Sequence, residues 1–177
     1  MGFSLNGVWQ TEHSWVRNKD GQFLRESARF LKKLSNDASA EFPVAMDRYH
    51  LYVSGACPWA HRVLIVRMLF GLEEFLPVSE VSPLMREFGW VFDELHTDQL
   101  YGSQRLHEIY VKSLSRYTGR VTVPVLFDAH REVIVNNESS ELVRMLNSVA
   151  PRTKNTELDL YPDALVTQID EWNERIY

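Results

Sequence analysis

Apolar residues between positions 47 and 71 change from a strand pattern to a helix pattern at one short turn. In residues 47–54, every second position from Tyr49 onward carries an aromatic or aliphatic side chain, which is typical of a strand. From Pro58 the apolar residues recur at helical spacing until Gly71, a residue that commonly follows the last turn of a helix. We therefore expect a strand, a turn and a mostly buried helix.

The alternation between strand and helix patterns continues as far as residue 150. Near residue 138 the sequence turns acidic and serine-rich, which suits the positive N-terminal end of a helix. The predicted segments are a strand over 75–82, a loop over 83–102, a helix over 103–115, strands over 120–128 and 132–137, and a helix over 138–150.

Pro124 lies in the middle of the predicted strand 120–128. Proline has no N–H for the hydrogen-bond ladder, so it belongs at a sheet edge, at a bulge or at the start of a strand. A cis Val123–Pro124 peptide bond would explain the position, although only about 5–6% of X–Pro bonds in folded proteins are cis.

The two ends of the chain carry weaker patterns. Residues 1–46 predict an irregular arm lying over the domain, with a faint helical period that begins at Phe30 and stops at Pro43. Residues 151–177 predict a linker and then a further helix, with Pro162 near its first turn. The aromatic residues of the arm are Phe3, Trp9, Trp15, Phe23 and Phe30.

The order of these segments predicts an α/β fold. It reads β-α-β, a helical stretch, β-β-α, a linker and one more helix, and two hairpin-joined strands after a β-α-β unit make a four-stranded mixed sheet. We expect an N-terminal arm over 1–46, one sheet domain over 47–150, and a linker with a helix over 151–177.

Composition excludes several classes of function. The net charge is −5, the pI is about 5.7 and no run of Lys or Arg exceeds two residues, so nucleic acid is not an expected partner. No apolar run approaches the ~20 residues of a transmembrane helix, and the N-terminus lacks the pattern of a secretory signal. We expect a cytoplasmic protein without a membrane partner.

The chain has one cysteine, Cys57, and this excludes an internal disulfide and a multi-thiolate metal site. Cys57 lies between the predicted strand and helix, and Pro58 at the first helical position places it at or near the N-cap. Thiols beside a helix N-terminus have pKa values of about 3.5–7.5 instead of about 8.5. The position therefore predicts a nucleophilic thiolate, to which His61 and Arg62 add positive potential if they face back.

Two alternatives bear on this cysteine. A free cysteine is often simply a small buried hydrophobic residue. If it is reactive, the segment resembles a Cys-x-x-Cys motif in which Ala60 replaces the second cysteine. Because no resolving thiol exists in the chain, a mixed disulfide at Cys57 must be released by a thiol from solution, which favours glutathione over protein dithiol exchange.

Several longer strings resemble glutathionyl-hydroquinone reductases, which are also called xi-class glutathione transferases. The resemblance extends over nearly the whole chain and implies a thioredoxin-like fold followed by an all-helical domain. The strings are LNGVW (5–9), DRYHLYVS (47–54), CPWAHR (57–62), SPLM (82–85), GW (89–90), GRVTVPVLFD (119–128) and NNESSEL (136–142).

The resemblance implies that Cys57 takes glutathione from a glutathionyl-hydroquinone as a mixed disulfide, which a second glutathione then reduces. It implies that the backbone of Val123, before Pro124, pairs with the cysteinyl part of glutathione as an added strand would. It also implies that Glu138 and Ser139 hold the γ-glutamyl end; both are equally understandable as ordinary residues at a helix start.

Two further residues are implied in the same way. Trp90 would flank glutathione, or else it is a loop residue packed on the core. Arg120 would approach the glycyl carboxylate, as expected of a guanidinium near an anion. No metal is implied, and glutathione is the expected cosubstrate.

In that family the helical second half supplies the hydroquinone pocket and much of the dimer contact. This chain ends at Tyr177, inside the expected first helix of that half. We expect glutathione affinity to be kept, turnover of glutathionyl-hydroquinones to be weak or lost, and the apolar side of the last helix to favour self-association, including a possible homodimer. The alternatives are an omega-like thiol transferase or dehydroascorbate reductase, and an impaired thioredoxin-fold fragment that serves as an interaction module.

Overall fold

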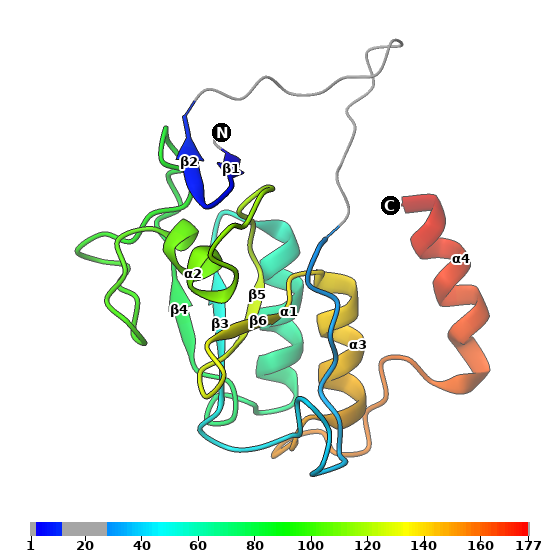
Figure 1. Cartoon of the computed structure of the whole chain (residues 1–177). Coiled ribbons are helices and arrows are strands. Elements are labelled where there is room, and N and C mark those ends of the chain that lie inside the picture. The colour runs from blue at the N-terminus through cyan, green and yellow to red at the C-terminus, as the bar shows by residue number, and fades with distance from the viewer. Residues whose placement is uncertain (1–2, 12–27, 177) are drawn as a thin grey trace.

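The computed structural model describes residues 3–11 and 28–176; Trp15 and Phe23 of the predicted arm lie outside these ranges. The elements are β1 Phe3–Leu5, β2 Val8–Gln10, β3 Tyr49–Val53, α1 Pro58–Leu69, β4 Val78–Glu80, α2 Leu106–Ser113, β5 Val125–Asp128, β6 Val133–Asn136, α3 Ser139–Val149, the 3₁₀ helix η1 Asp163–Leu165, and α4 Val166–Ile176 (Figure 1).

The central sheet has four strands in the order β4-β3-β5-β6. β3 is parallel to β4 and antiparallel to β5, and β5 is antiparallel to β6. The predicted four-stranded mixed sheet is therefore confirmed. The parallel pair is joined through α1, as a crossover connection requires, and the β5–β6 pair is a short hairpin.

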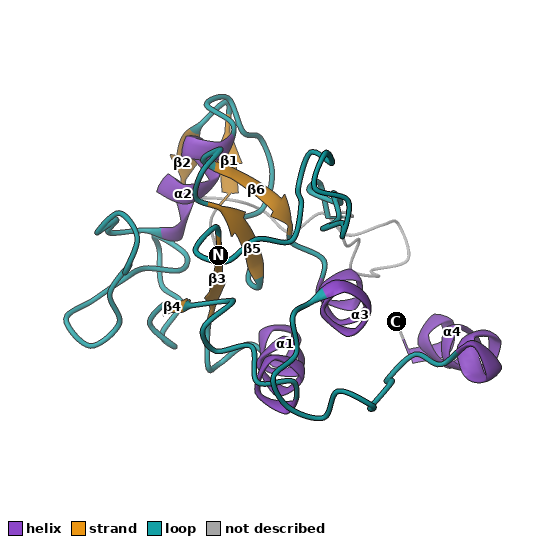
Figure 2. Ribbon diagram, turned by 90° about the horizontal axis from the view of Figure 1, so that it is seen from below, coloured by secondary structure: helices purple, strands orange, loops and turns teal. Residues whose placement is uncertain are grey.

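Helices cover the sheet from two sides: α1 and α3 lie side by side on one face and α2 lies on the other (Figure 2). α1 buries Ala60, Val63 and Val66 completely or almost completely. α3 contributes Leu142 and Leu146, each 1% exposed, to the same layer. This layer fixes the first residues of both helices beside each other, and those residues form the site described below.

β3 is buried on both faces, which simple alternation does not predict. His50 and Tyr52 are as inaccessible as their neighbours. The rings of Phe92 and Phe127 lie 6.1 Å from that of Tyr52 and cover this second face. Aromatic residues from a loop and from β5 thus close the side that α1 and α3 leave open.

The first helix covers the sheet with one side only. Ile65 and Met68 are 45% and 66% exposed, so the prediction of a mostly buried helix over α1 is wrong. The helix ends where expected: Gly71 has a φ of +63°, a left-handed conformation that glycine adopts without strain.

The predicted strand 120–128 is shorter in the structure. β5 begins at Val125, and residues 120–124 form an irregular segment that contains a cis Val123–Pro124 peptide bond. The sequence indicates both possibilities, an interruption of the strand at Pro124 and a cis peptide bond before it. The irregular segment leads to the mouth of the site.

The faint helical period after Phe30 is wrong. This stretch is extended and runs beside β6: Lys32 donates its amide to the Val135 carbonyl at 3.0 Å, and Asn137 donates to the Phe30 carbonyl at 3.0 Å. β6 is a sheet edge with free backbone groups, and pairing with that edge outweighs a weak local preference for helix. The arm is also not wholly irregular, since β1 and β2 form an antiparallel hairpin.

α4 stands apart from the sheet, beyond α3, in both views (Figures 1 and 2). Its link to the rest includes an ion pair between Arg144 of α3 and Asp170, with 2.5 Å between N and O. Trp172 and Ile176 on α4 are 61% and 74% exposed. Among the helices within 3–11 and 28–176, none is long and apolar enough to cross a membrane.

Candidate functional site

Cys57 is the N-cap residue of α1. Its backbone is extended (φ −102°, ψ 112°), Pro58 follows at the first helical position, and the Cys57 carbonyl accepts hydrogen bonds from the amides of Ala60 and His61 at 3.1 and 3.0 Å. The side chain makes no capping bond to its own helix. The predicted position of Cys57 at the N-terminal end of this helix is therefore confirmed, and its role as a nucleophile stays a prediction.

The thiol of Cys57 faces the irregular segment before β5. Sγ lies 3.5 Å from the Val123 carbonyl oxygen, to which it donates a weak hydrogen bond, and the residue is half-buried. The alternative of a fully buried structural cysteine does not hold, because part of the side chain stays accessible.

A cavity of about 280 Å³ opens beside this thiol. It brings together six of the seven residues that the sequence singles out: Cys57, Trp90, Arg120, Val123, Pro124 and Ser139. The other lining residues are Trp59, Met85, Val121, Thr122 and Asn137.

Glu138, the seventh residue, lies next to the lining instead of within it. It is the N-cap of α3, and its carboxylate accepts hydrogen bonds from the amide and the hydroxyl of Ser140, each at 3.2 Å. Glu138 therefore caps the helix whose first residue, Ser139, faces the cavity. The capping role that sequence reasoning gives as the simpler explanation exists alongside any role in binding.

Arg62 joins the two helix starts, a role that sequence reasoning missed. From α1 its guanidinium donates to the Ser139 hydroxyl from Nε at 3.1 Å and from a terminal nitrogen at 2.6 Å. It also lies 3.8 Å from the Glu138 carboxylate and over the ring of Trp59, at 5.1 Å. In the sequence, the position of Arg62 one turn after Cys57 is the only indication of this role. An arginine on an exposed helix surface can occupy the same position.

Residues 120–124 form one wall of the cavity, and Tyr110 supports this wall through hydrogen bonds. Its hydroxyl donates to the Thr122 carbonyl at 2.8 Å and accepts hydrogen bonds from the Thr122 amide and the Asn137 side chain, each at 3.2 Å. Burial of the ring raises the pKa of Tyr110, so the hydroxyl keeps its proton. Thr122 and Asn137 thus lie at fixed positions in the cavity.

Val123 presents its backbone at this wall. Its carbonyl accepts the Cys57 thiol, while its amide makes no hydrogen bond with any residue within 3–11 and 28–176. A backbone N–H at a cavity wall requires an acceptor from solvent or from a ligand. This segment can accept an extended peptide as an added strand.

Trp90 is almost completely buried, with 8% exposure. Its carbonyl accepts a hydrogen bond from the amide of Leu106, the first residue of α2, at 3.0 Å. The Trp90 ring packs on the core and also lines the cavity, so its contact with glutathione stays a prediction.

Within the described ranges, no group of three or more His, Cys, Asp and Glu side chains is arranged to hold a metal ion. The polar groups that line the cavity are the Cys57 thiol, the hydroxyls of Thr122 and Ser139, the Asn137 amide, the Arg120 guanidinium and the Val123 backbone.

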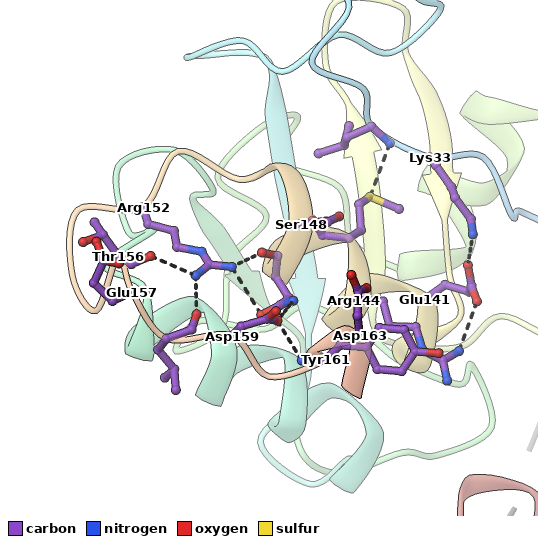
Figure 3. Close-up of a pocket in the computed structure, with 14 residues that line it drawn as sticks. Lys33, Glu141, Arg144, Ser148, Arg152, Thr156, Glu157, Asp159, Tyr161 and Asp163 are labelled. Carbon is purple, nitrogen blue, oxygen red and sulfur yellow. Dashed lines mark hydrogen bonds and ion pairs between the residues drawn. The ribbon is translucent and has the colours of Figure 1, made fainter. Parts of the chain in front are cut away.

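A larger cavity, of about 650 Å³, lies between α3 and the chain that follows it (Figure 3). Its cationic side chains already bind neighbours: Lys33 lies 2.6 Å from Glu141, and Arg152 donates to the Asn147 carbonyl. Asn147 in turn donates to Asp159 at 2.8 Å. We assign this cavity to the joint between α3 and the linker.

Comparison with known proteins agrees with this geometry. Residues 56–149 match the family described as glutathione S-transferase, N-terminal domain. The glutathionyl-hydroquinone reductase YqjG of Escherichia coli (strain K12) is 44% identical over 187 residues, which cover 100% of this chain and 57% of the relative. The glutathione S-transferase omega-like 2 of Schizosaccharomyces pombe is 46% identical over 167 residues, covering 90% and 53%.

Solved structures agree as well. A xi-class glutathione transferase from Natrialba magadii has a TM-score of 0.87 at 38% identity, covering 100% of this chain and 54% of its own. The glutathione-bound structure of E. coli YqjG has a TM-score of 0.80 at 42% identity, covering 99% and 55%. The resemblance read from the sequence and the thioredoxin-like fold it implied are confirmed; the chain spans little more than half the length of these relatives.

Proposed function

This chain belongs to the glutathione S-transferase family, and on that premise we propose that residues 47–150 bind glutathione with Cys57 as the nucleophile. The observation that carries the proposal is the position of the Cys57 sulfur. It lies at the start of a helix, opens on a cavity and contacts the segment before the cis proline.

Glutathione would lie extended across the cavity. Its cysteinyl part pairs with the Val123 backbone beside Pro124, and this brings its sulfur to Cys57. Its γ-glutamyl end lies at the start of α3, where Ser139 and the helix N-terminus favour a carboxylate and Glu138 favours the ammonium. Trp90 flanks the peptide, and Arg120 neutralises the glycyl carboxylate.

The reaction proposed is reduction of a glutathionyl-hydroquinone. The Cys57 thiolate attacks the glutathione sulfur, the sulfur–aryl bond breaks, the aryl carbon takes up a proton, and a protein–glutathione disulfide forms as hydroquinone leaves. The thiolate of a second glutathione then attacks the glutathione sulfur of that disulfide and restores Cys57. One glutathionyl-hydroquinone and one glutathione give one hydroquinone and one oxidised glutathione.

Two measurements test the thiol. Titration calorimetry should show reduced glutathione binding to the chain. Intact mass after exposure to oxidised glutathione should show one glutathione adduct, and Cys57→Ser should abolish it. An adduct that persists in the serine variant, or a wild-type chain that binds no glutathione, would refute the proposal.

An omega-like thiol transferase is a second candidate, favoured by the 46% identity to a protein of that name. Both candidates use the same cysteine and differ in the acceptor. Parallel assays with glutathionyl-menadiol and with dehydroascorbate distinguish them: consumption of the first supports the reductase, and consumption of the second alone supports the omega-like activity. Since glutathione is the cosubstrate and the lone thiol fits a reducing compartment, we also propose a cytoplasmic location.

A further inference from the structure

The β1–β2 hairpin is bonded to the segment that leads into one wall of the cavity. Ser4 and Gly119 exchange two backbone hydrogen bonds, at 3.0 and 2.9 Å, and the Gly7 amide donates to the Tyr117 carbonyl at 2.8 Å. The next residue in the chain is Arg120, which lines the cavity. The hairpin therefore fixes the start of the 120–124 wall.

Trp9, on the same hairpin, contacts the segment that carries another wall. Its indole N–H donates to the Glu87 carbonyl at 3.0 Å. A Cβ placed on Gly89 would lie 2.7 and 2.9 Å from two atoms of the Trp9 ring. The Trp9 ring therefore packs so close to the Gly89 backbone that a side chain does not fit between them. The residue that follows Gly89 is Trp90, the cavity-lining tryptophan.

The hairpin itself is fixed to the body of the domain beside α2 (Figures 1 and 2). The Ser4 hydroxyl is buried and lies 3.1 Å from Nε2 of His107 on α2. The ring of Trp9 lies 5.4 Å from the ring of His107. One small element, anchored on a helix, thus holds two loops that are about 30 residues apart in the sequence.

We propose that the β1–β2 hairpin sets the distance between the Trp90 and Arg120 walls of the cavity, with Trp9 as the positioning residue. The inference rests on the proposed function, because glutathione is the ligand that would lie between these walls. Trp9 does not line the cavity, and it acts through the loop that ends at Trp90. Small displacements of supporting residues are enough to weaken a site of this kind.

A pair of glycine variants isolates the contact with Trp9. Gly89→Ala and Gly102→Ala both place a side chain at a left-handed backbone position, with φ of +71° and +66°. A Cβ at Gly102 has no atom within 4 Å, whereas one at Gly89 overlaps the Trp9 ring. We expect the Kd for glutathione to rise about tenfold in Gly89→Ala and less than twofold in Gly102→Ala, measured by calorimetry.

A second pair changes the hairpin. Trp9→Ala removes the ring and its N–H, while Val8→Ala removes a side chain that is 62% exposed on the same hairpin. We expect Trp9→Ala to weaken glutathione binding about tenfold and Val8→Ala to leave it unchanged. Trp9→Phe, which keeps most of the ring, gives an intermediate Kd if Trp9→Ala does not fold.

Hydrogen exchange tests the coupling without glutathione. In Trp9→Ala, amides of residues 86–91 and of residues 117–121 should exchange faster together, and Val8→Ala should change neither segment. Equal Kd values for the two glycine variants, or faster exchange confined to residues 86–91, would overturn the proposal. If the wild-type chain binds no glutathione, the proposed function fails, while the exchange result still decides whether the hairpin couples the two loops.

Discussion

Arg62 connects the two helix starts at the candidate site. It bonds the Ser139 hydroxyl twice and lies 3.8 Å from the Glu138 carboxylate, while 31% of its own side chain stays exposed. A planar guanidinium with several donors suits such a branched arrangement, and an ammonium cannot reproduce it.

We therefore expect Arg62→Met to weaken glutathione binding about tenfold, because Ser139 loses its fixed orientation. Arg62→Lys keeps the charge and should give an intermediate Kd. The matched control is Arg116→Met, at an exposed arginine away from the cavity lining. Calorimetry with reduced glutathione measures the effect, and equal Kd values for Arg62→Met and the control would contradict it.

His50 gives the fold a dependence on pH. The ring is 4% exposed and hydrogen-bonds the Ser79 hydroxyl at 2.8 Å. Burial lowers its pKa from 6.5 to about 4; nearby Asp98 opposes this and Arg67 adds to it. The folded chain therefore holds His50 neutral at pH values where the unfolded chain binds a proton.

The lowered pKa of His50 fixes the direction in which stability changes with pH. Above about pH 6.5 both states are neutral at this residue, and between pH 6.5 and 4 protons favour the unfolded state by up to about 3 kcal/mol. We expect urea unfolding to show stability falling as pH drops through this window. His50→Gln, which can still bond Ser79, should flatten the slope; an unchanged slope would show that His50 is not its source.

At the scale of single elements, α3 combines two functions at its first turn. Glu138 accepts a hydrogen bond from the Ser140 amide and so caps the helix, while Ser139 faces the cavity. In the proposed complex, the Glu138 charge would serve both the helix dipole and the ammonium of the ligand. The two contributions can be separated because capping needs only an oxygen atom, whereas ion pairing needs the charge.

Glu138→Gln should keep the cap and lose the charge, so we expect glutathione binding to weaken about tenfold with little change in stability. Glu138→Ala loses both, and the free energy of unfolding should fall by a further ~1 kcal/mol. Chemical denaturation and calorimetry on the two variants provide the comparison. If the glutamine variant binds as tightly as the wild type, Glu138 is a cap alone.

The sequence predicts some helices and strands better than others. Strands β3, β5 and β6 and helices α1, α2 and α3 lie within the predicted segments, because each buries a face whose period is visible locally. The docking of the β1–β2 hairpin and the extended run at Lys32 escape prediction since the residues they bond, Gly119 and Val135, lie more than 100 positions away. Backbone pairing over that distance leaves no periodic signal.

The residues of the candidate site also differ in how well the sequence predicts them. The sequence singles out Cys57 by its local setting and Trp90, Arg120 and Ser139 by the family strings, and the structure places these residues at one cavity. Thr122 and Asn137 escape prediction, because they reach the cavity through hydrogen bonds to Tyr110 on another element. Such contacts exist only once the sheet and α2 have packed.

At the scale of the whole molecule, α4 is the least integrated element. Trp172 and Ile176 are 61% and 74% exposed, and no residue of α4 is buried among those the structure describes. Exposed aromatic and aliphatic side chains on one helix favour association. Homodimerisation of this chain remains a prediction on that basis.

We expect Trp172→Gln to lower the tendency to self-associate in sedimentation velocity while changing the free energy of unfolding by less than about 0.5 kcal/mol. Leu95→Gln is the control, since Leu95 is 89% exposed in a loop away from α4. Reduced association in both variants would point to general hydrophobicity, and reduced association in neither would exclude this side of α4.

The position of one half-exposed sulfur has a consequence for oxidative damage. Peroxide would oxidise the accessible thiol of Cys57 to a sulfenic acid, which normally condenses with a nearby thiol and so escapes irreversible oxidation. These 177 residues offer no second cysteine for that rescue. Survival of the sulfur under oxidant would then depend on how fast small thiols in solution reach it, and a depleted thiol pool would leave it open to irreversible oxidation.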